Sequence, residues 1–112
     1  MCGIIALFGE KRDVPRDLLT HRGPDNYRRE IMGKCQMDYY RLAINDLSDA
    51  GMQPFVRPNR MFVCNGEIYN HRSFRSGEEK SRSDCEVVMN LIHTLGIENT
   101  IRSINGDFAM VY

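Results

Sequence analysis

The sequence predicts an α+β fold in which helices pack against an antiparallel sheet. Short runs of β-type residues, separated by glycine, proline and asparagine, fill much of the chain. Two segments in the second half show the spacing of apolar residues that is typical of amphipathic helices. The 112 residues are enough for one domain at most. We therefore expect one α+β domain over residues 1–112.

The first half is predicted to contain three strands and one helix. A strand is expected over residues 3–9, where the run GIIALFG ends at a glycine. A helix of about two turns is expected over residues 15–22, because its proline follows an aspartate by two residues and a glycine follows the segment. Strands over residues 28–32 and 35–44 flank the turn pair Gly33-Lys34.

The middle of the chain combines a loop, a strand and a polar connection. Residues 45–59 are rich in turn formers and predict a loop. The run RMFVC over residues 60–64 predicts a strand that leads into the segment NGEIYN. Residues 71–82 are polar and charged, and we expect them to form an exposed connection.

The last part of the chain is predicted to contain a helix, a short amphipathic segment and a strand. Ser83 and Glu86 have the spacing of a capping box, and apolar residues at helical spacing follow as far as Gly96. Residues 98–104 form the amphipathic segment, and residues 107–112 read as a strand that is apolar on both faces. Such a strand is expected inside a sheet, with a partner on each edge and a layer on each side.

Composition narrows the class of function. Fifteen basic and fifteen acidic residues cancel, so no charge pattern indicates nucleic acid or a membrane surface as a partner. No run approaches the length of a membrane span, and no secretory signal is evident. We therefore expect the four cysteines to be thiols in a reducing, cytoplasmic setting. Their spacing does not match that of zinc sites, and no metal site is predicted.

Cys2 is the first candidate for chemistry. A buried structural thiol is the ordinary interpretation of a lone cysteine. If Met1 is removed, however, the Cys2 thiol lies beside a free α-amino group, whose ordinary pKa is about 7.7–8.0. Such an amine accepts the thiol proton at neutral pH and returns it later, so one residue supplies both nucleophile and base.

The pair Asn65-Gly66 has two interpretations. Taken alone, Asn-Gly is the strongest short signal for a hairpin turn. In the functional interpretation the Asn65 side-chain amide and the Gly66 backbone N–H are two neutral donors close together, which could form an oxyanion hole.

Three charged residues could recognise an α-amino acid. Arg41 lies in an otherwise apolar run, where its guanidinium either reaches the surface or binds a carboxylate in bidentate fashion. Asp84, at the predicted start of a helix, and Glu67 could bind an ammonium group, although both are ordinary residues at such positions. His21 is interpreted as a surface or capping residue, and Cys64 and Cys85 as buried or cap-adjacent thiols.

Seven motifs together resemble a known family. MCGI, HRGPD, RLAI-D, G-QP, NGEIYN, SDCE and GDFA, where a hyphen stands for any residue, occur in the order found in class II glutamine amidotransferase domains, above all those of glutamine-dependent asparagine synthetases. The resemblance covers nearly the whole chain. It implies an N-terminal-nucleophile fold, in which two antiparallel sheets are sandwiched between helices, and it implies hydrolysis of L-glutamine to glutamate and ammonia.

The resemblance also implies roles for individual residues. Cys2 would be the nucleophile after removal of Met1, and Asn65 and Gly66 would form the oxyanion hole. The residues expected to hold glutamine are Arg41, Ile44, Asn45, Asn65, Gly66, Glu67 and Asp84. No cofactor is expected in this chain, since ATP and magnesium belong to the synthetase domain of the family.

The sequence differs from the family in extent. Two connections are shorter than in the family, and residues 1–112 correspond to the N-terminal part of the amidotransferase domain without a synthetase domain. We therefore expect a partner synthetase domain or companion chain, self-association through the strand at residues 107–112, and reduced activity of the isolated chain. The alternative functions are a non-catalytic remnant, an assembly module and a glutamine-binding module.

Overall fold

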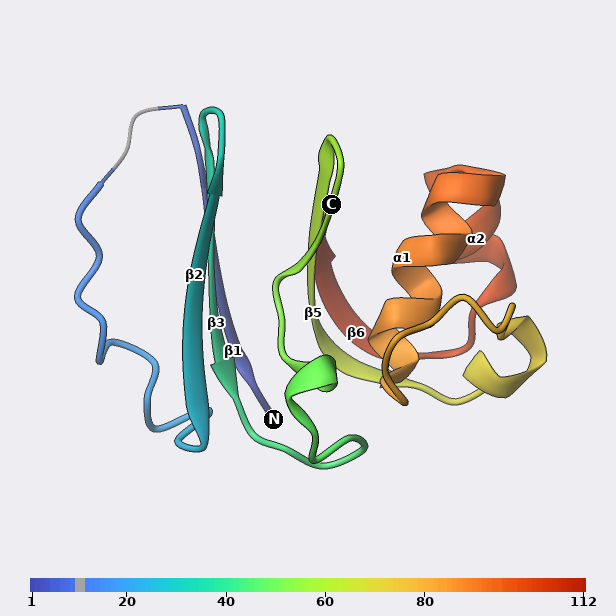
Figure 1. Cartoon of the computed structure of the whole chain (residues 1–112), viewed down its shortest axis with the longest axis horizontal. Helices are drawn as coiled ribbons and strands as arrows, with labels where there is room; N and C mark the ends of the chain where they lie inside the picture. The colour runs from blue at the N-terminus through green and yellow to red at the C-terminus, as the bar shows by residue number, and fades with distance from the viewer. Residues whose placement is uncertain (10–11) are drawn as a thin grey trace.

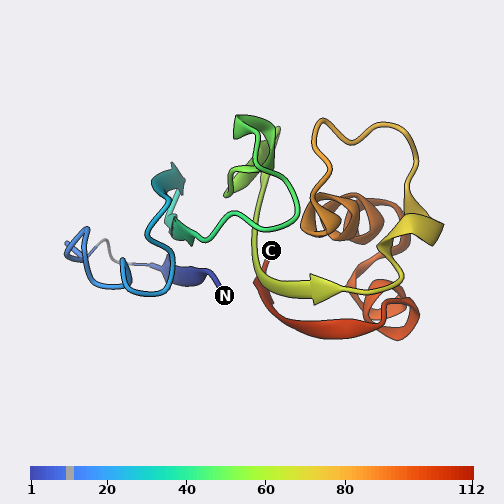
Figure 2. The same ribbon diagram turned by 90° about the horizontal axis from the view of Figure 1, so that it is seen from below.

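The computed structural model describes residues 1–9 and 12–112, and it shows an α+β fold. Two three-stranded antiparallel sheets lie beside each other, and both α-helices cover the far side of the second sheet (Figure 1). Figure 2 shows the same order of layers from below. The α+β prediction is confirmed.

The first sheet has the order β1-β3-β2. Its strands are β1 (Gly3–Phe8), β2 (Asn26–Met32) and β3 (Cys35–Arg41), and both neighbours pair with β3 in antiparallel register. The three predicted strands of the first half are confirmed. The third is shorter than expected because the chain leaves the sheet after Arg41, and the predicted continuation to Ile44 is wrong.

The second sheet has the order β4-β5-β6. Its strands are β4 (Phe55–Arg57), β5 (Arg60–Ile68) and β6 (Gly106–Val111). β4 lies within the segment that was expected to be a loop. β5 contains Asn65 and Gly66, so the hairpin turn that this pair suggests is wrong. A two-residue hairpin of that type needs positive φ at both residues, and neither has it, since both continue the pairing with β6.

The long helix begins and ends as predicted. α1 (Asp84–Leu95) follows Ser83, whose side chain accepts a hydrogen bond from the Cys85 N–H. It ends at Gly96, which has φ +80° and donates its N–H to the Ile92 carbonyl. α2 (Ile97–Ser103) is the predicted amphipathic segment.

Glu86 does not complete the predicted capping box. Its buried carboxylate accepts hydrogen bonds from Ser81 and from the Lys80 N–H, and it forms an ion pair with Arg57 at 2.6 Å. Four donors from other segments therefore take the place of the Ser83 N–H, which binds the Ser81 hydroxyl instead. The carboxylate fastens the connection before α1 to the body of the domain. That connection also contains the short 3₁₀-helix η2 (His71–Phe74).

The helix predicted over residues 15–22 is wrong. Residues 16–22 form successive turns, held by bonds such as the one from the Leu18 N–H to the Pro15 carbonyl. The segment offers two adjacent leucines and no apolar stripe, so a helix there would bury too little surface to offset its nucleation cost. It lies on the outer side of the first sheet, where the Val14 carbonyl accepts a bond from Arg29 (Figure 1). The sandwich that the resemblance implies would have helices on this face of the sheet. The described residues on this face form turns and irregular structure instead.

Two clusters of apolar side chains hold the layers together. One lies between the sheets and includes Met37, Tyr39 and Val63. The other lies between the second sheet and α1 and includes Phe62 and Val88. Successive residues of β5 thus point into different clusters, as the alternation of a strand requires.

β6 also contributes to both clusters. Phe108 and Met110 pack against the helical side, and Val111 packs between the sheets. The predicted layer on each side of this strand is therefore confirmed. β5 is its partner on one edge, and a partner on the other edge stays a prediction.

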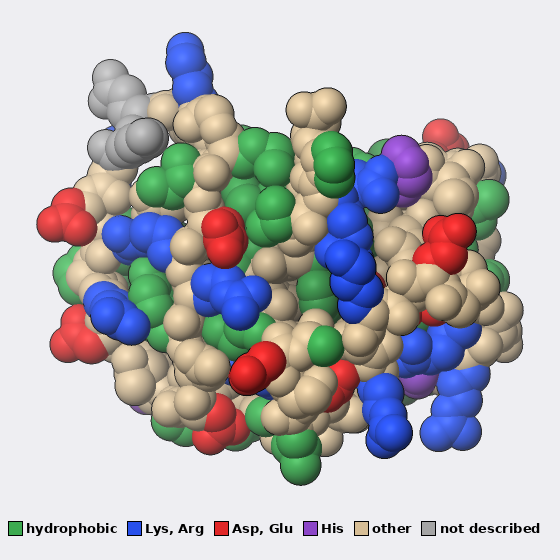
Figure 3. All heavy atoms as spheres, viewed as in Figure 1, with side chains coloured by type: hydrophobic (Ala, Val, Ile, Leu, Met, Phe, Trp, Pro, Cys, Tyr) green, Lys and Arg blue, Asp and Glu red, His purple; other side chains and the backbone are tan. Residues whose placement is uncertain are grey.

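Basic and acidic side chains are interspersed on the face shown in Figure 3. Neither helix among residues 1–9 and 12–112 has both the length and the apolar character needed to cross a bilayer.

Candidate active site

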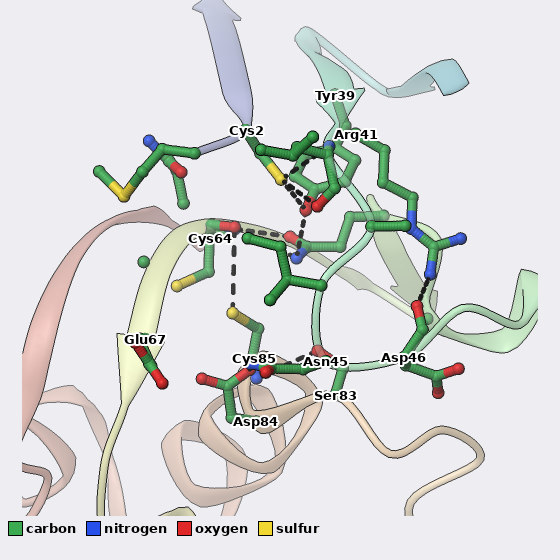
Figure 4. A pocket seen from close by; sticks show the side chains of 18 residues that line it. Cys2, Tyr39, Arg41, Asn45, Asp46, Cys64, Glu67, Ser83, Asp84 and Cys85 are labelled. Carbon is green, nitrogen blue, oxygen red and sulfur yellow. Dashed lines mark hydrogen bonds between the residues drawn. The ribbon is translucent and has the colours of Figure 1, made fainter. Parts of the chain in front are cut away.

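A pocket of about 190 Å³ opens between the two sheets and the start of α1 (Figure 4). This volume is below the roughly 300–1,000 Å³ of sites for drug-sized ligands, so it suits a small metabolite. Its wall comes from the N-terminus, the end of β3, the loop after it, the middle of β5 and the first turn of α1. All the residues predicted for the site line it, namely Cys2, Arg41, Ile44, Asn45, Asn65, Gly66, Glu67 and Asp84.

Cys2 lies where β1 enters the first sheet. Its half-buried side chain packs at the edge of the cluster between the sheets. The sulfur accepts hydrogen bonds from the Leu42 N–H at 3.2 Å and from the Tyr39 hydroxyl at 3.1 Å, and the thiol lies 3.4 Å from the Leu42 carbonyl. These contacts with Leu42 and Tyr39 fix the position of the sulfur at the pocket wall. Met1 is 64% exposed and also lines the pocket.

Tyr39 and Gln53 are pocket residues for which the sequence suggested no role. The Tyr39 hydroxyl binds the Cys2 sulfur and accepts a hydrogen bond from Gln53 Nε2 at 3.2 Å. Burial, together with the bond to Cys2, raises the pKa of Tyr39, so its hydroxyl keeps its proton at neutral pH. The only sequence signal was that Gln53 belongs to the QP motif of the resemblance.

Asn65 and Gly66 lie side by side in β5. The Asn65 residue pairs with Ala109 across the sheet, and Gly66 pairs with Phe108. Asn65 is half-buried and lines the pocket. Gly66 is also required by packing, because a Cβ there would lie 2.5 Å from the Phe108 Cα.

Arg41 is buried at the end of β3. Its guanidinium donates to the backbone carbonyls of Asp46 and Ser48, the latter at 2.9 Å. Two of its donors therefore shape the loop that forms one wall of the pocket, and the others remain for a ligand.

Asp46 anchors the same loop. Its carboxylate accepts bonds from the Ser48 hydroxyl at 2.6 Å, from the Ser48 N–H and from the Arg82 N–H at 2.7 Å. Burial by itself raises the pKa of Asp46, but the hydrogen bonds from Ser48 and Arg82 outweigh it, and the pKa lies below the ordinary 3.8. Asp46 thus joins the loop after β3 to the connection before α1.

The acidic groups differ in exposure. Asp84 is 3% exposed in the first turn of α1, and its carboxylate accepts the Ile68 N–H at 2.7 Å and lies 3.4 Å from Asn45 Nδ2. Glu67 is exposed at the pocket, as is Ile44. A ligand ammonium between Glu67 and Asp84 would meet negative charge from two different elements.

The remaining cysteines and His21 behave as expected. All four cysteines are free thiols, and both Cys64 and Cys85 are buried. A hydrogen-bonding contact with Cys64, together with burial, raises the pKa of the Cys85 thiol, which therefore makes a poor nucleophile. His21 is exposed in the turns on the outer side of the first sheet and does not line the pocket.

Comparisons with known proteins match this chain to one family. The family model of the glutamine amidotransferase domain matches residues 1–112. A probable asparagine synthetase (glutamine-hydrolysing) of Acanthamoeba polyphaga mimivirus is 36% identical over 99% of this chain and 23% of its own length. The asparagine synthetase (glutamine-hydrolysing) of Homo sapiens is 37% identical over 99% of this chain and 22% of its own length.

The chain thus spans between a fifth and a quarter of the length of these curated relatives. The match of the family model over the whole sequence, together with this level of identity, decides the classification. The chain belongs to the family of glutamine amidotransferase domains.

Proposed function

We propose that this chain hydrolyses L-glutamine to glutamate and ammonia, with Cys2 as an N-terminal nucleophile. The observation that carries the proposal is the pocket. It brings the Cys2 sulfur together with an amide donor, a guanidinium and two carboxylates that come from distant parts of the sequence. These groups are the ones that a carboxamide substrate with an α-amino acid head would need.

Removal of Met1 is the first requirement. While Met1 is present, the Cys2 nitrogen belongs to a peptide bond and cannot accept a proton. After removal, the α-amine takes the thiol proton and the sulfur attacks the side-chain carboxamide carbon of glutamine. The negative charge that develops on the carboxamide oxygen would be stabilised by the Asn65 side-chain amide and the Gly66 N–H.

The intermediate then divides into two products. The C–N bond breaks, the amine returns its proton to the leaving nitrogen, and ammonia departs, leaving a thioester between Cys2 and the glutamyl group. Water, activated by the same amine, attacks the thioester carbon and releases glutamate and the free thiol. A reducing compartment such as the cytoplasm suits this chemistry, because the sulfur has to remain a thiol.

The remaining pocket residues would hold the amino acid head of glutamine. Arg41 would bind the α-carboxylate through the donors that its loop does not use. Glu67 and Asp84 would bind the α-ammonium, and Ile44 and Asn45 would line the same side of the pocket. This assignment is supported by the opposite charges of the two sets of groups.

The ammonia is proposed to serve asparagine synthesis. Both named relatives are asparagine synthetases (glutamine-hydrolysing) that are much longer than this chain. A synthetase domain or companion chain would use the ammonia, and ATP and magnesium would bind there. We assign residues 1–112 to the amidotransferase part, in the N-terminal-nucleophile class.

Glutamine-dependent ammonia release tests the proposal. The protein should release ammonia and glutamate in equal amounts, and Cys2→Ala should abolish release while glutamine binding remains measurable. Cys35→Ser is the matched control, because that half-buried thiol does not line the pocket and its loss should leave the rate unchanged. Binding of glutamine without hydrolysis would instead support a glutamine-binding module, and neither binding nor hydrolysis would support a non-catalytic remnant.

A further inference from the structure

A chain of hydrogen bonds connects the second sheet to the Cys2 sulfur. The Cys64 N–H donates to Gln53 Oε1 at 2.6 Å, and Gln53 Nε2 lies 3.1 Å from the Cys64 carbonyl. The same Nε2 donates to the Tyr39 hydroxyl at 3.2 Å, and that hydroxyl lies 3.1 Å from the Cys2 sulfur. We call Tyr39 and Gln53, with these bonds, the Tyr39 relay.

The direction of every bond in the relay is determined by the Cys64 backbone. An N–H can only donate and a carbonyl can only accept, so Cys64 places Oε1 of Gln53 toward its N–H and Nε2 toward its carbonyl. Nε2 therefore faces Tyr39 as a donor, and the Tyr39 oxygen accepts from it. The single hydroxyl hydrogen is then left to point at the Cys2 sulfur.

The buried Tyr39 side chain lies largely among apolar side chains. Tyr39 is 5% exposed and belongs to the cluster between the sheets, with Met37, Met52, Met61 and Val63. A hydroxyl in such surroundings costs free energy unless it is hydrogen-bonded, and its bonds are to Cys2 and Gln53. Phenylalanine would fill the same apolar space but would leave one hydrogen of the buried Gln53 Nε2 without its acceptor, so the hydroxyl serves the hydrogen bonds and not the packing.

We propose that Tyr39 is a positioning residue that holds the Cys2 sulfur and favours its thiolate by donating a hydrogen bond to it. The inference rests on the proposed function, because it assigns Cys2 as the nucleophile. Together with the Leu42 N–H, Tyr39 would hold the sulfur at the wall of the pocket. The relay also ties the sulfur to Cys64, the residue just before Asn65 and Gly66, so nucleophile and proposed oxyanion donors share one support.

The test is the pH profile of Cys2 alkylation by iodoacetamide, followed by mass mapping of the modified peptide. Tyr39→Phe should move the midpoint upward by roughly one pH unit, the effect of losing one hydrogen bond to a charged atom. Tyr40→Phe is the matched control, because the Tyr40 hydroxyl points to the other side of β3 and lies 3.4 Å from the Pro15 carbonyl. Its profile should coincide with that of the unmodified protein.

A second measurement changes the acidity of the tyrosine hydroxyls without removing them. Replacing all five tyrosines by 3-fluorotyrosine strengthens the phenol as a donor, so the midpoint should move to lower pH, and it should not do so in the Tyr39→Phe protein. Turnover of glutamine by Tyr39→Phe should fall by about tenfold with KM little changed. An alkylation midpoint of the Tyr39→Phe protein equal to that of the unmodified protein would overturn the inference. If Tyr39→Phe fails to fold, the fluorotyrosine protein decides, and an alkylation midpoint that does not move would overturn the inference.

The two proposals fail separately. If the alkylation midpoints move as expected while the protein releases no ammonia from glutamine, the relay stands and the proposed hydrolysis does not. If ammonia release depends on Cys2 while the midpoints do not move, the hydrolysis stands and the relay does not.

Discussion

Gly66 and Phe108 face each other across β5 and β6 so closely that Gly66 has no room for a side chain. A Cβ built on Gly66 would lie 2.5 Å from the Phe108 Cα, a separation that real Cβ atoms essentially never show. The residue proposed to donate its N–H to an oxyanion is therefore also a packing residue of the second sheet. Its two roles have to be separated by experiment.

Gly66→Ala is expected to lower stability rather than to act as a clean probe of catalysis. Relief of the contact requires β6 to move, and overpacking of this kind typically costs about 1–3 kcal/mol. Urea unfolding should show a lower midpoint for this variant. A midpoint equal to that of the unmodified protein would mean that β6 yields without cost, which contradicts the packing role.

Asn65→Ala is expected to lower turnover while it leaves stability nearly unchanged. Its side chain lines the pocket and is half-buried, so truncation should leave the unfolding midpoint nearly unchanged. Turnover should fall by on the order of 10²–10³, the usual effect of removing one oxyanion donor. Ammonia release measured at saturating glutamine checks this, and a rate within a factor of two of the unmodified protein would remove Asn65 from the oxyanion hole.

Arg41→Lys is expected to weaken glutamine binding by roughly 10- to 100-fold, because an ammonium cannot reproduce the guanidinium fork. The variant also loses bonds to the Asp46 and Ser48 carbonyls, so its stability has to be measured in parallel. Arg102→Lys, on the exposed face of α2, is the control. Equal affinity of the Arg41→Lys protein for glutamine by calorimetry would show that the carboxylate assignment is wrong.

Asp46→Asn is expected to destabilise the protein in a pH-dependent way. The folded pKa of Asp46 lies below 3.8, so its carboxylate contributes stability above that value and loses it as the pH falls through the folded pKa. The difference in unfolding free energy between the two proteins should therefore be present at pH 7 and shrink below pH 3.8. Urea unfolding at both conditions measures it, and a difference that grows toward low pH would contradict the assignment.

The sequence predicted the elements whose signals are local. α1 begins after Ser83 and ends before Gly96, because the side-chain cap and the positive φ are properties of those residues themselves. Other signals were overridden by distant contacts. Asn65-Gly66 is extended because β6 pairs with it, and Glu86 turns from Ser83 because Arg57 and Ser81 bind it instead.

The residues of the candidate site likewise divide into those that the sequence could predict and those that it could not. The residues that carry charge or reactivity could be named from type and motif, and the pocket brings them together. Tyr39 and Gln53 could not, because the roles proposed for them depend on contacts with Cys2, 37 residues from Tyr39, and with Cys64, 11 residues from Gln53. A tyrosine in a strand and a glutamine before a proline show no local sign of such contacts.

The proposed hydrolysis requires the Cys2 amine as its base, and two synthetic chains test this requirement directly. One begins at Met1 and the other at Cys2, and both are assayed for ammonia release from glutamine after intact-mass measurement of the N-terminus. We expect release from the chain that begins at Cys2 and none from the chain that keeps Met1, since a peptide nitrogen cannot take the thiol proton. Equal rates from the two chains would contradict the mechanism.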